Sequence, residues 1–220
     1  MERDIQAPTG DNLQWTQWQL LDSVLPTGGF AHSYGLEAAI QAHIAVGPEG
    51  LKTHLLHVLD NTGSLLLPFV YGMNRSPDLE TWLKLDRLLE ATLTNEVSRK
   101  ASASQGSALL RVAASVFSDL SIIRQIREKF SGSGAAHFHH AAVFGLISGL
   151  IGFDSETAQR AYLFMTMRDT ISAATRLNLI GPLGASVLQH QVVEEACQTA
   201  PLLDAVQGCH SYLFSRLFCS

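Results

Sequence analysis

The spacing of apolar residues constrains the fold of this chain more strongly than any other feature. Apolar residues recur three or four positions apart along most of it, as in the series Leu163, Met167, Ile171, Ala174 and Leu177. This spacing places side chains on one face of an α-helix. No run of four or more residues shows the apolar and polar alternation of a half-buried strand. At 220 residues, the chain is predicted to be a single-domain, all-α helical bundle of nine or ten helices.

Capping residues and helix breakers divide this pattern into segments. Ser76 is predicted to be an N-cap before Pro77, a residue favoured at the first helical position, and Asp154 marks another helix start. The pair Gly181 and Pro182 ends one helix and begins the next. These signals predict helices at residues 14–23, 32–45, 48–72, 77–95, 96–117, 119–130, 136–151, 154–180 and 182–198.

The two ends of the chain differ in composition from the middle. Residues 1–13 are polar and are predicted to form a disordered arm without a signal peptide, followed by an all-helical domain over 14–207. Residues 208–220 contain three aromatic side chains and one arginine, which are typical interface anchors. We expect this tail to dock on another protein, although a last helix packed on its own core would also explain it.

The composition disfavours several classes of partner. A net charge of -5 with only 16% charged residues leaves no basic surface for nucleic acids or anionic membranes. The longest apolar run, residues 141–153, is shorter than the roughly 20 residues of a membrane span and is interrupted by glycines, so it predicts a buried helix. The three cysteines never form a C-x-x-C pair, which suits a reducing, cytoplasmic location.

Residues 25–37, with the sequence LPTGGFAHSYGLE, form an unusually rich break between two helical patterns. Pro26 fixes its own φ angle, whereas glycine adopts backbone angles that are closed to other residues, so we expect a shaped loop suited to contact. A phosphate-binding loop is disfavoured because no G-x-x-x-x-G-K-[ST] motif occurs and the next lysine is Lys52. His32 and Ser33 are expected to cap the following helix. The candidate partner-binding residues of this loop are Gly28, Gly29, Phe30, His32, Ser33 and Glu37.

His137, His139 and His140 form the densest histidine cluster, and imidazole suits nickel, zinc and copper. On the helix predicted over 136–151, His137 and His140 would share a face while His139 points elsewhere. Polar contacts at a helix start are therefore the preferred interpretation, and a metal site is the alternative. If these histidines did bind a metal, the protein would be a nickel-binding chaperone or a helical metalloenzyme.

Other polar residues indicate no catalytic device. His54 and His57 repeat the three-residue spacing and are predicted to lie at the edge of an amphipathic helix. Neither G-x-S-x-G nor H-E-x-x-H occurs, so no catalytic residue is assigned. Arg168, Asp169 and Arg176 interrupt an apolar helix, where they form either a structural ion pair or a partner-facing cluster.

Several of these segments resemble one family. Residues 25–37 match the pattern L-P-x-G-G-F-x-H-S-x-G-L-E of the urease accessory protein F (UreF) family at every specified position. Residues 96–109 resemble its E-L-R-x-A-S-x-x-Q-G-x-x-L segment, with Ser98 in place of an arginine that the adjacent Arg99 is expected to replace. Residues 172–184 resemble its S-A-A-x-R-L and P-L-G region, with the longer connection of the eukaryotic branch.

The end of the chain is also similar to this family. Residues 214–220 resemble its Y-S-R-L-F-R-S ending, with Phe214 in place of tyrosine and Cys219 in place of arginine. Tyr212 is a candidate to supply the missing hydroxyl group. The resemblance extends from about residue 18 to residue 220. The resemblance adds six residues to the candidates for partner binding, namely Arg176, Tyr212, Phe214, Arg216, Leu217 and Phe218.

The resemblance implies a non-enzymatic scaffold, and neither a cofactor nor a metal site is assigned to the chain. Such a protein is all-α and homodimeric, and it binds the accessory protein UreD, also called UreH, which orders its tail. The complex then recruits the GTPase UreG and docks on apo-urease, which couples GTP hydrolysis to nickel insertion and lysine carbamylation. The residues themselves indicate only helices, a shaped loop and an apolar tail.

Overall fold

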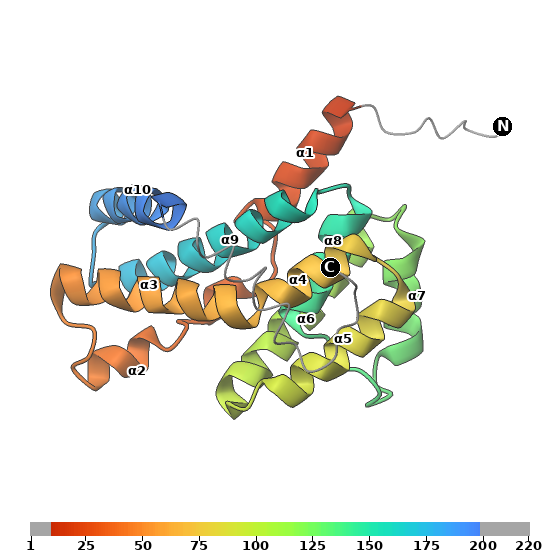
Figure 1. Ribbon diagram of the computed structural model, residues 1–220, viewed down its shortest axis with the longest axis horizontal. Helices are drawn as coiled ribbons and strands as arrows, with labels where there is room; N and C mark the ends of the chain where they lie inside the picture. Colours follow the sequence, from red (N-terminus) through yellow and green to blue (C-terminus); the bar gives the residue numbers. More distant parts are fainter. Residues whose placement is uncertain (1–9, 199–220) are drawn as a thin grey trace.

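The computed structural model describes residues 10–198 and confirms the all-α prediction (Figure 1). Over that range it contains ten α-helices, one short 3-10 helix and no strand. The elements are α1 (Gly10–Leu21), η1 (Gly29–Ala31), α2 (Leu36–Gln41), α3 (Gly47–Leu65), α4 (Leu67–Arg75), α5 (Leu79–Thr92), α6 (Glu96–Val116), α7 (Ser121–Phe130), α8 (His140–Leu150), α9 (Ser155–Arg176) and α10 (Pro182–Gln198). None of these helices is both long and apolar enough to cross a membrane.

Most of the apolar run over residues 141–153 lies in α8, and residues 140–148 of that helix are all buried, as predicted. Its glycines allow a neighbouring helix to approach. A Cβ atom at Gly145 would lie 2.8 Å from the carbonyl oxygen of Val70, and one at Gly149 would lie 2.7 Å from that of Asn74. Both carbonyls belong to α4, so the glycine spacing permits close packing of α4 against α8.

Two apolar cores hold the helices together, and α9 contributes to both. The larger core is built from α4 to α8 with the first half of α9, around residues such as Trp82, Phe144 and Ala158. The smaller core lies between α2, α3, the second half of α9 and α10, around Leu55 and Val192. Because α9 spans both cores, it forms the spine of the molecule (Figure 1).

Several predicted boundaries were wrong, for identifiable reasons. The helix predicted over 48–72 breaks at Leu66 because Pro68 begins a new helix and cannot donate a backbone hydrogen bond. The helix predicted over 32–45 is reduced to α2, since Gly35 and His43 have φ angles of 80° and 57° at its two ends. The helix predicted over 154–180 ends at Arg176.

Some helix starts agree with the predictions and others differ. Asp154 caps α9 as predicted, because its carboxylate accepts the backbone N–H of Thr157 at 2.9 Å. The cap of α5 is Asp78 rather than Ser76, so Pro77 precedes that helix. The helix predicted over 136–151 begins only at His140. At the N-terminus, α1 begins at Gly10, before the predicted start at residue 14.

Candidate functional site

The loop that connects α1 to α2 has the shape that its glycines predict. Gly28 has a φ angle of 82°, in the left-handed region that favours glycine. The backbone N–H groups of Ala31 and His32 then donate to the carbonyls of Gly28 and Gly29 at 3.0 and 3.1 Å. These bonds close one tight turn, so the loop is an ordered feature of the surface.

Gly29 allows this turn to lie directly against α9. Its Cα faces the carboxylate of Asp169, which is only 4% exposed, and a Cβ at this position would overlap Oδ2. The positive φ angle belongs to Gly28, whereas Gly29 is required by the close approach to the carboxylate. The two adjacent glycines therefore have different physical roles.

Arg168 and Asp169 form a structural ion pair beneath the loop. The Nε and Nη2 atoms of Arg168 donate to Oδ1 of Asp169 at 3.0 and 2.9 Å, and Nη1 donates to the carbonyl of Leu21 at the end of α1. Burial raises the pKa of Asp169, although the guanidinium opposes that shift. One charged pair thus ties the end of α1 and the loop to α9.

Arg176 is arranged differently from this pair, because it faces outward. Its guanidinium lies 5.3 Å from the ring centroid of Phe30, and its Nε donates to the carbonyl of Ser172 at 3.4 Å. Phe30 is 50% exposed. A cation over an aromatic ring is a favourable contact that also restricts both side chains. A cavity of about 280 Å³ lies beside the turn, lined by the loop, Arg168 and Asp169.

The structure corrects the expected caps of α2. The N-cap residue is Gly35, which makes no side-chain capping bond, so neither His32 nor Ser33 has that role. Ser33 instead accepts the backbone N–H of Leu36 through its carbonyl at 3.0 Å. Burial lowers the pKa of His32, and the nearby Asp169 opposes this shift. Glu37 is exposed in the first turn of α2.

Polar groups behind the loop are bonded within the protein. Burial raises the pKa of the Tyr34 hydroxyl, and the nearby side chains of Gln105 and Thr166 oppose that shift. His140 is buried with its Nδ1 atom 3.2 Å from the hydroxyl of Tyr162. Burial lowers the pKa of His140 to about 4, so this ring is neutral at physiological pH.

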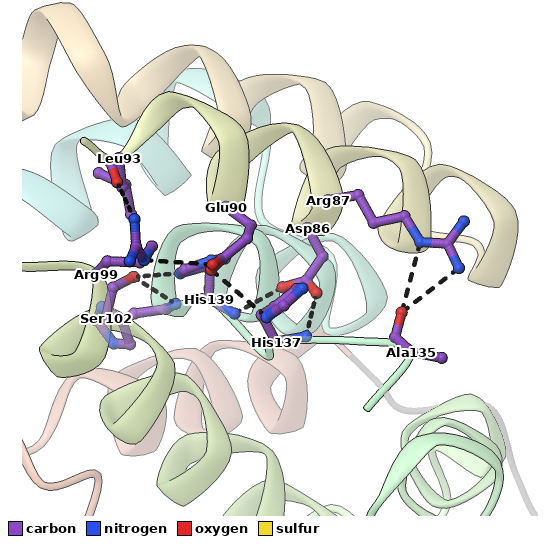
Figure 2. Close-up of polar contacts among 10 residues, drawn as sticks. Asp86, Arg87, Glu90, Leu93, Arg99, Ser102, Ala135, His137 and His139 are labelled. Carbon is purple, nitrogen blue, oxygen red and sulfur yellow. Dashed lines mark hydrogen bonds and ion pairs between the residues drawn. The ribbon is translucent and has the colours of Figure 1, made fainter. Parts of the chain in front are cut away.

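His137 and His139 lie in a segment that precedes α8, and His140 is the first residue of that helix (Figure 2). The buried carboxylate of Asp86 accepts the backbone N–H groups of His137 and His139, each at 2.7 Å. Phe138 between them has a φ angle of 62°, and its carbonyl lies where a Cβ of Gly106 would be. These contacts stop α8 from beginning earlier, so the expected shared helix face of His137 and His140 does not form.

Both histidine rings of this segment contact groups within the protein (Figure 2). Nε2 of His139 lies 3.0 Å from Oε2 of Glu90, and Nδ1 lies 3.2 Å from the Ser102 hydroxyl. Nδ1 of His137 lies 3.5 Å from the same carboxylate oxygen, while Arg99 contacts Oε1 at 3.3 Å. Burial lowers the pKa of His139. Within residues 10–198, no three His, Cys, Asp or Glu side chains are placed to hold a metal ion.

Sequence reasoning missed the residues that organise this corner of the molecule. Asp86 and Glu90 lie on α5, and Ser102 and Gly106 lie on α6, far from the histidines in sequence. The one available signal in the sequence was Asp86, a carboxylate in the apolar series that includes Leu85 and Leu89.

The other histidine pair lies on α3. His54 is half-buried and His57 is exposed, as expected at the edge of an amphipathic helix.

The structure brings together one part of the predicted partner-binding set and does not test another. Gly29 and Phe30 meet α9 at Asp169 and Arg176, and His32 lies close enough to Asp169 to affect its pKa. Glu37 is exposed in the first turn of α2, which follows the loop. The remaining candidates, Tyr212, Phe214, Arg216, Leu217 and Phe218, lie outside the described residues.

Comparison with known proteins agrees with the resemblance. Residues 46–193 match the family model described as UreF. Urease accessory protein F of Oryza sativa subsp. japonica is 67% identical over 221 residues, which cover 94% of this chain and 85% of the relative. The Arabidopsis thaliana protein of the same name is 63% identical over 223 residues, covering 94% and 93%. UreF of Trichodesmium erythraeum is 28% identical over 219 residues, covering 91% and 94%. The chain therefore belongs to the UreF family.

Proposed function

We propose that this chain is a non-enzymatic scaffold for the maturation of urease. It binds a UreD-type accessory protein, recruits the GTPase UreG and presents the complex to apo-urease, so that GTP hydrolysis is coupled to nickel insertion. Membership of a family whose relatives are named urease accessory proteins supports this role. The nickel ion is cargo in this proposal and is not a resident cofactor.

The geometry of the loop carries the proposal. The turn at Gly28 and Gly29 is held from below by Asp169, while Phe30 and Arg176 face solvent as a stacked pair. A partner that binds such a surface loses little conformational entropy in ordering it. Exposed arginine and aromatic side chains are also the residues that contribute most at interfaces. The loop is thus suited to recognition of another protein.

The histidine segment favours a structural role over the alternative metal function. Glu90, Ser102 and Asp86 engage the rings and backbone of His137 and His139, so these groups support the packing of α5, α6 and α8. A metal ion would have to displace those contacts. We therefore assign neither a nickel-carrying nor a metalloenzyme function to this cluster.

The remaining parts of the proposal concern assembly and location. A homodimer is supported by exposed aliphatic side chains, including Leu183 at 81% and Ile44 at 74% exposure, which a second copy would cover. The cysteine pattern supports a cytoplasmic location, and the low charge argues against nucleic-acid and membrane partners. Residues 208–220 are proposed to dock on the UreD-type partner.

Size-exclusion chromatography with light scattering tests this function directly. The full chain, the chain truncated after Gln207 and the Arg216→Ala variant would each be mixed with a plant UreD-type protein. A stable complex that forms only with the intact tail is the expected result. The scaffold function would be contradicted if the full chain did not bind the partner and contained stoichiometric metal by elemental analysis.

A further inference from the structure

The exposed aromatic side chains of the described region all come from three elements that are joined to one another. They are Trp15 and Trp18 on α1, Phe30 on η1 and Phe164 on α9, with exposed fractions of 66%, 54%, 50% and 40%. Every other tryptophan, phenylalanine and tyrosine between residues 10 and 198 is buried or half-buried. Such a grouping of exposed aromatic residues is characteristic of a protein interface.

Helix α1 projects from the body of the molecule (Figure 1). It is attached near its end, where Leu20 is 1% exposed, Gln17 donates to the carbonyl of Gly152 at 3.1 Å and the Leu21 carbonyl accepts from Arg168. Trp15 and Trp18 are three residues apart, with ring centroids 5.2 Å apart at 80°. A 12-residue helix is marginally stable without tertiary contacts, so this exposed pair indicates a missing contact.

Two arginines of α9 contact the elements that carry the other exposed aromatic residues. Phe164 and Arg168 are four residues apart and lie on neighbouring positions of one face of α9, whereas Arg176, eight residues later, is turned away from Phe164 by about 120°. Arg168 contacts the end of α1, and Arg176 lies over Phe30. The end of α1 and the loop that follows it therefore both lie against α9.

The described part of the chain ends at Gln198, the last residue of α10. Helix α10 packs against α9 in the opposite direction, so that it points back towards the side where α1 leaves the body (Figure 1). The 22 residues after Gln198 start there. A protein that captures the tail would thus be brought next to α1.

We infer that α1 is a second docking element for the partner that binds the tail. The inference rests on the proposed function and adds a named surface to it. Trp15 and Trp18 are the anchors of a helix that lies in a groove on the UreD-type accessory protein. Residues 14–21 carry no charged side chain, so the groove is apolar with neutral hydrogen-bonding groups at its edge.

The test compares the affinities of three full-length chains for a plant UreD-type protein by isothermal titration calorimetry. Truncating both anchors in a Trp15→Ala/Trp18→Ala variant should weaken binding by at least about 30-fold. The matched control is Val97→Ala on α6, which is 78% exposed and should bind within about twofold of the unmodified chain. Because all three sites are exposed, each variant should unfold at nearly the same urea concentration.

A spectroscopic measurement identifies which molecule covers the tryptophans. The chain contains three tryptophans, and the third, Trp82, is fully buried, so labelling with 5-fluorotryptophan gives two reporters on α1 and one internal reference. The inference predicts that the Trp15 and Trp18 resonances shift when the UreD-type protein is added, whereas that of Trp82 does not.

The possible failures are distinguishable. If the unmodified chain binds the UreD-type protein and the double variant binds equally well, the inference about α1 is wrong and the proposed function stands. If the unmodified chain does not bind at all, the proposed function is wrong as well. Resonances of Trp15 and Trp18 that change on truncation after Gln198 alone, or on dilution, would overturn the inference in favour of the chain's own tail or a second copy.

Discussion

The glycine loop at residues 25–37 and the histidine segment at residues 135–140 both pack closely against a helix, but their side chains point in different directions. Both interrupt the helices, and both approach another helix through a glycine that has no room for a Cβ. In the histidine segment the polar groups turn inward to Asp86 and Glu90. In the loop, Asp169 supports the backbone while Phe30 remains exposed. The polar groups of the histidine segment are thus used in packing, whereas the loop leaves an aromatic side chain exposed.

The largest effect is expected for Gly106→Ala, which attacks the histidine segment. The new Cβ would overlap the Phe138 carbonyl and lie 2.8 Å from the backbone nitrogen of His140. Because these neighbours are backbone atoms, the free energy of unfolding should fall by about 4 kcal/mol or the variant should not fold. Urea titration measures this, with Gly181→Ala as the control, since nothing lies within 4 Å of that site. Equal stability of the two variants would show that the segment adapts.

The next largest effect is expected for Asp86→Asn, which changes few atoms. An amide has one acceptor oxygen, so only one of the two backbone N–H groups at His137 and His139 would keep its partner. The loss of stability should be about 3 kcal/mol, because a buried donor without an acceptor is costly. Partner affinity should hardly change in molecules that remain folded. A variant with normal stability and lost binding would reverse the roles assigned to the two regions.

A pH-dependent effect should come from His140, the last residue of the histidine segment. Its pKa is about 4 in the folded protein, below the ordinary value of 6.5, so the unfolded chain binds more protons between these values. The stabilising contribution is present above pH 6.5 and is lost as the pH falls towards 4. Unfolding free energy should decrease by about 2 kcal/mol between about pH 7.5 and pH 5 from this group. His140→Phe should show a smaller decrease in the same urea titrations, and an unchanged pH profile would refute the assignment.

A smaller loss of stability is expected for Gly29→Ala, which attacks the loop. The methyl group meets a carboxylate at the end of a side chain instead of a backbone atom, so Asp169 can shift and the cost should be about 1 to 2 kcal/mol. The loss of binding free energy for the partner should be larger than this loss of stability, because the turn would move away from α9. Thermal unfolding and titration with the UreD-type partner measure the two effects. Retained affinity in a destabilised variant would mean that the loop position does not matter for binding.

The sequence predicted the fold class and the special loop because both depend on local properties. Helical periodicity is written in consecutive turns, and the glycines at 28 and 29 reveal a shaped break without knowledge of the rest. Pro68 also indicates the helix break at Leu66, and the helix predicted over 48–72 did not take it into account. The position of His137 and His139 before α8 depends on Asp86 and Gly106, which are distant in sequence, so local reasoning extended that helix too far.

The Arg168, Asp169 and Arg176 cluster shows the same limit in another form. The sequence left open whether these charges were structural or partner-facing. The structure divides them, because Arg168 and Asp169 pair beneath the loop while Arg176 covers Phe30 at the surface. Adjacent members of one helical motif can therefore have different roles, depending on which element packs against each.

The most direct test of the central claim is the affinity of three full-length variants for a plant UreD-type protein, with and without UreG. Phe30→Ala and Arg176→Ala change the exposed loop surface, whereas His137→Ala changes the half-exposed edge of the histidine segment. The account predicts that the first two variants weaken assembly by about tenfold or more and that the third does not. The opposite order, with assembly lost only in His137→Ala, would contradict the assignment of the loop as the partner-binding surface.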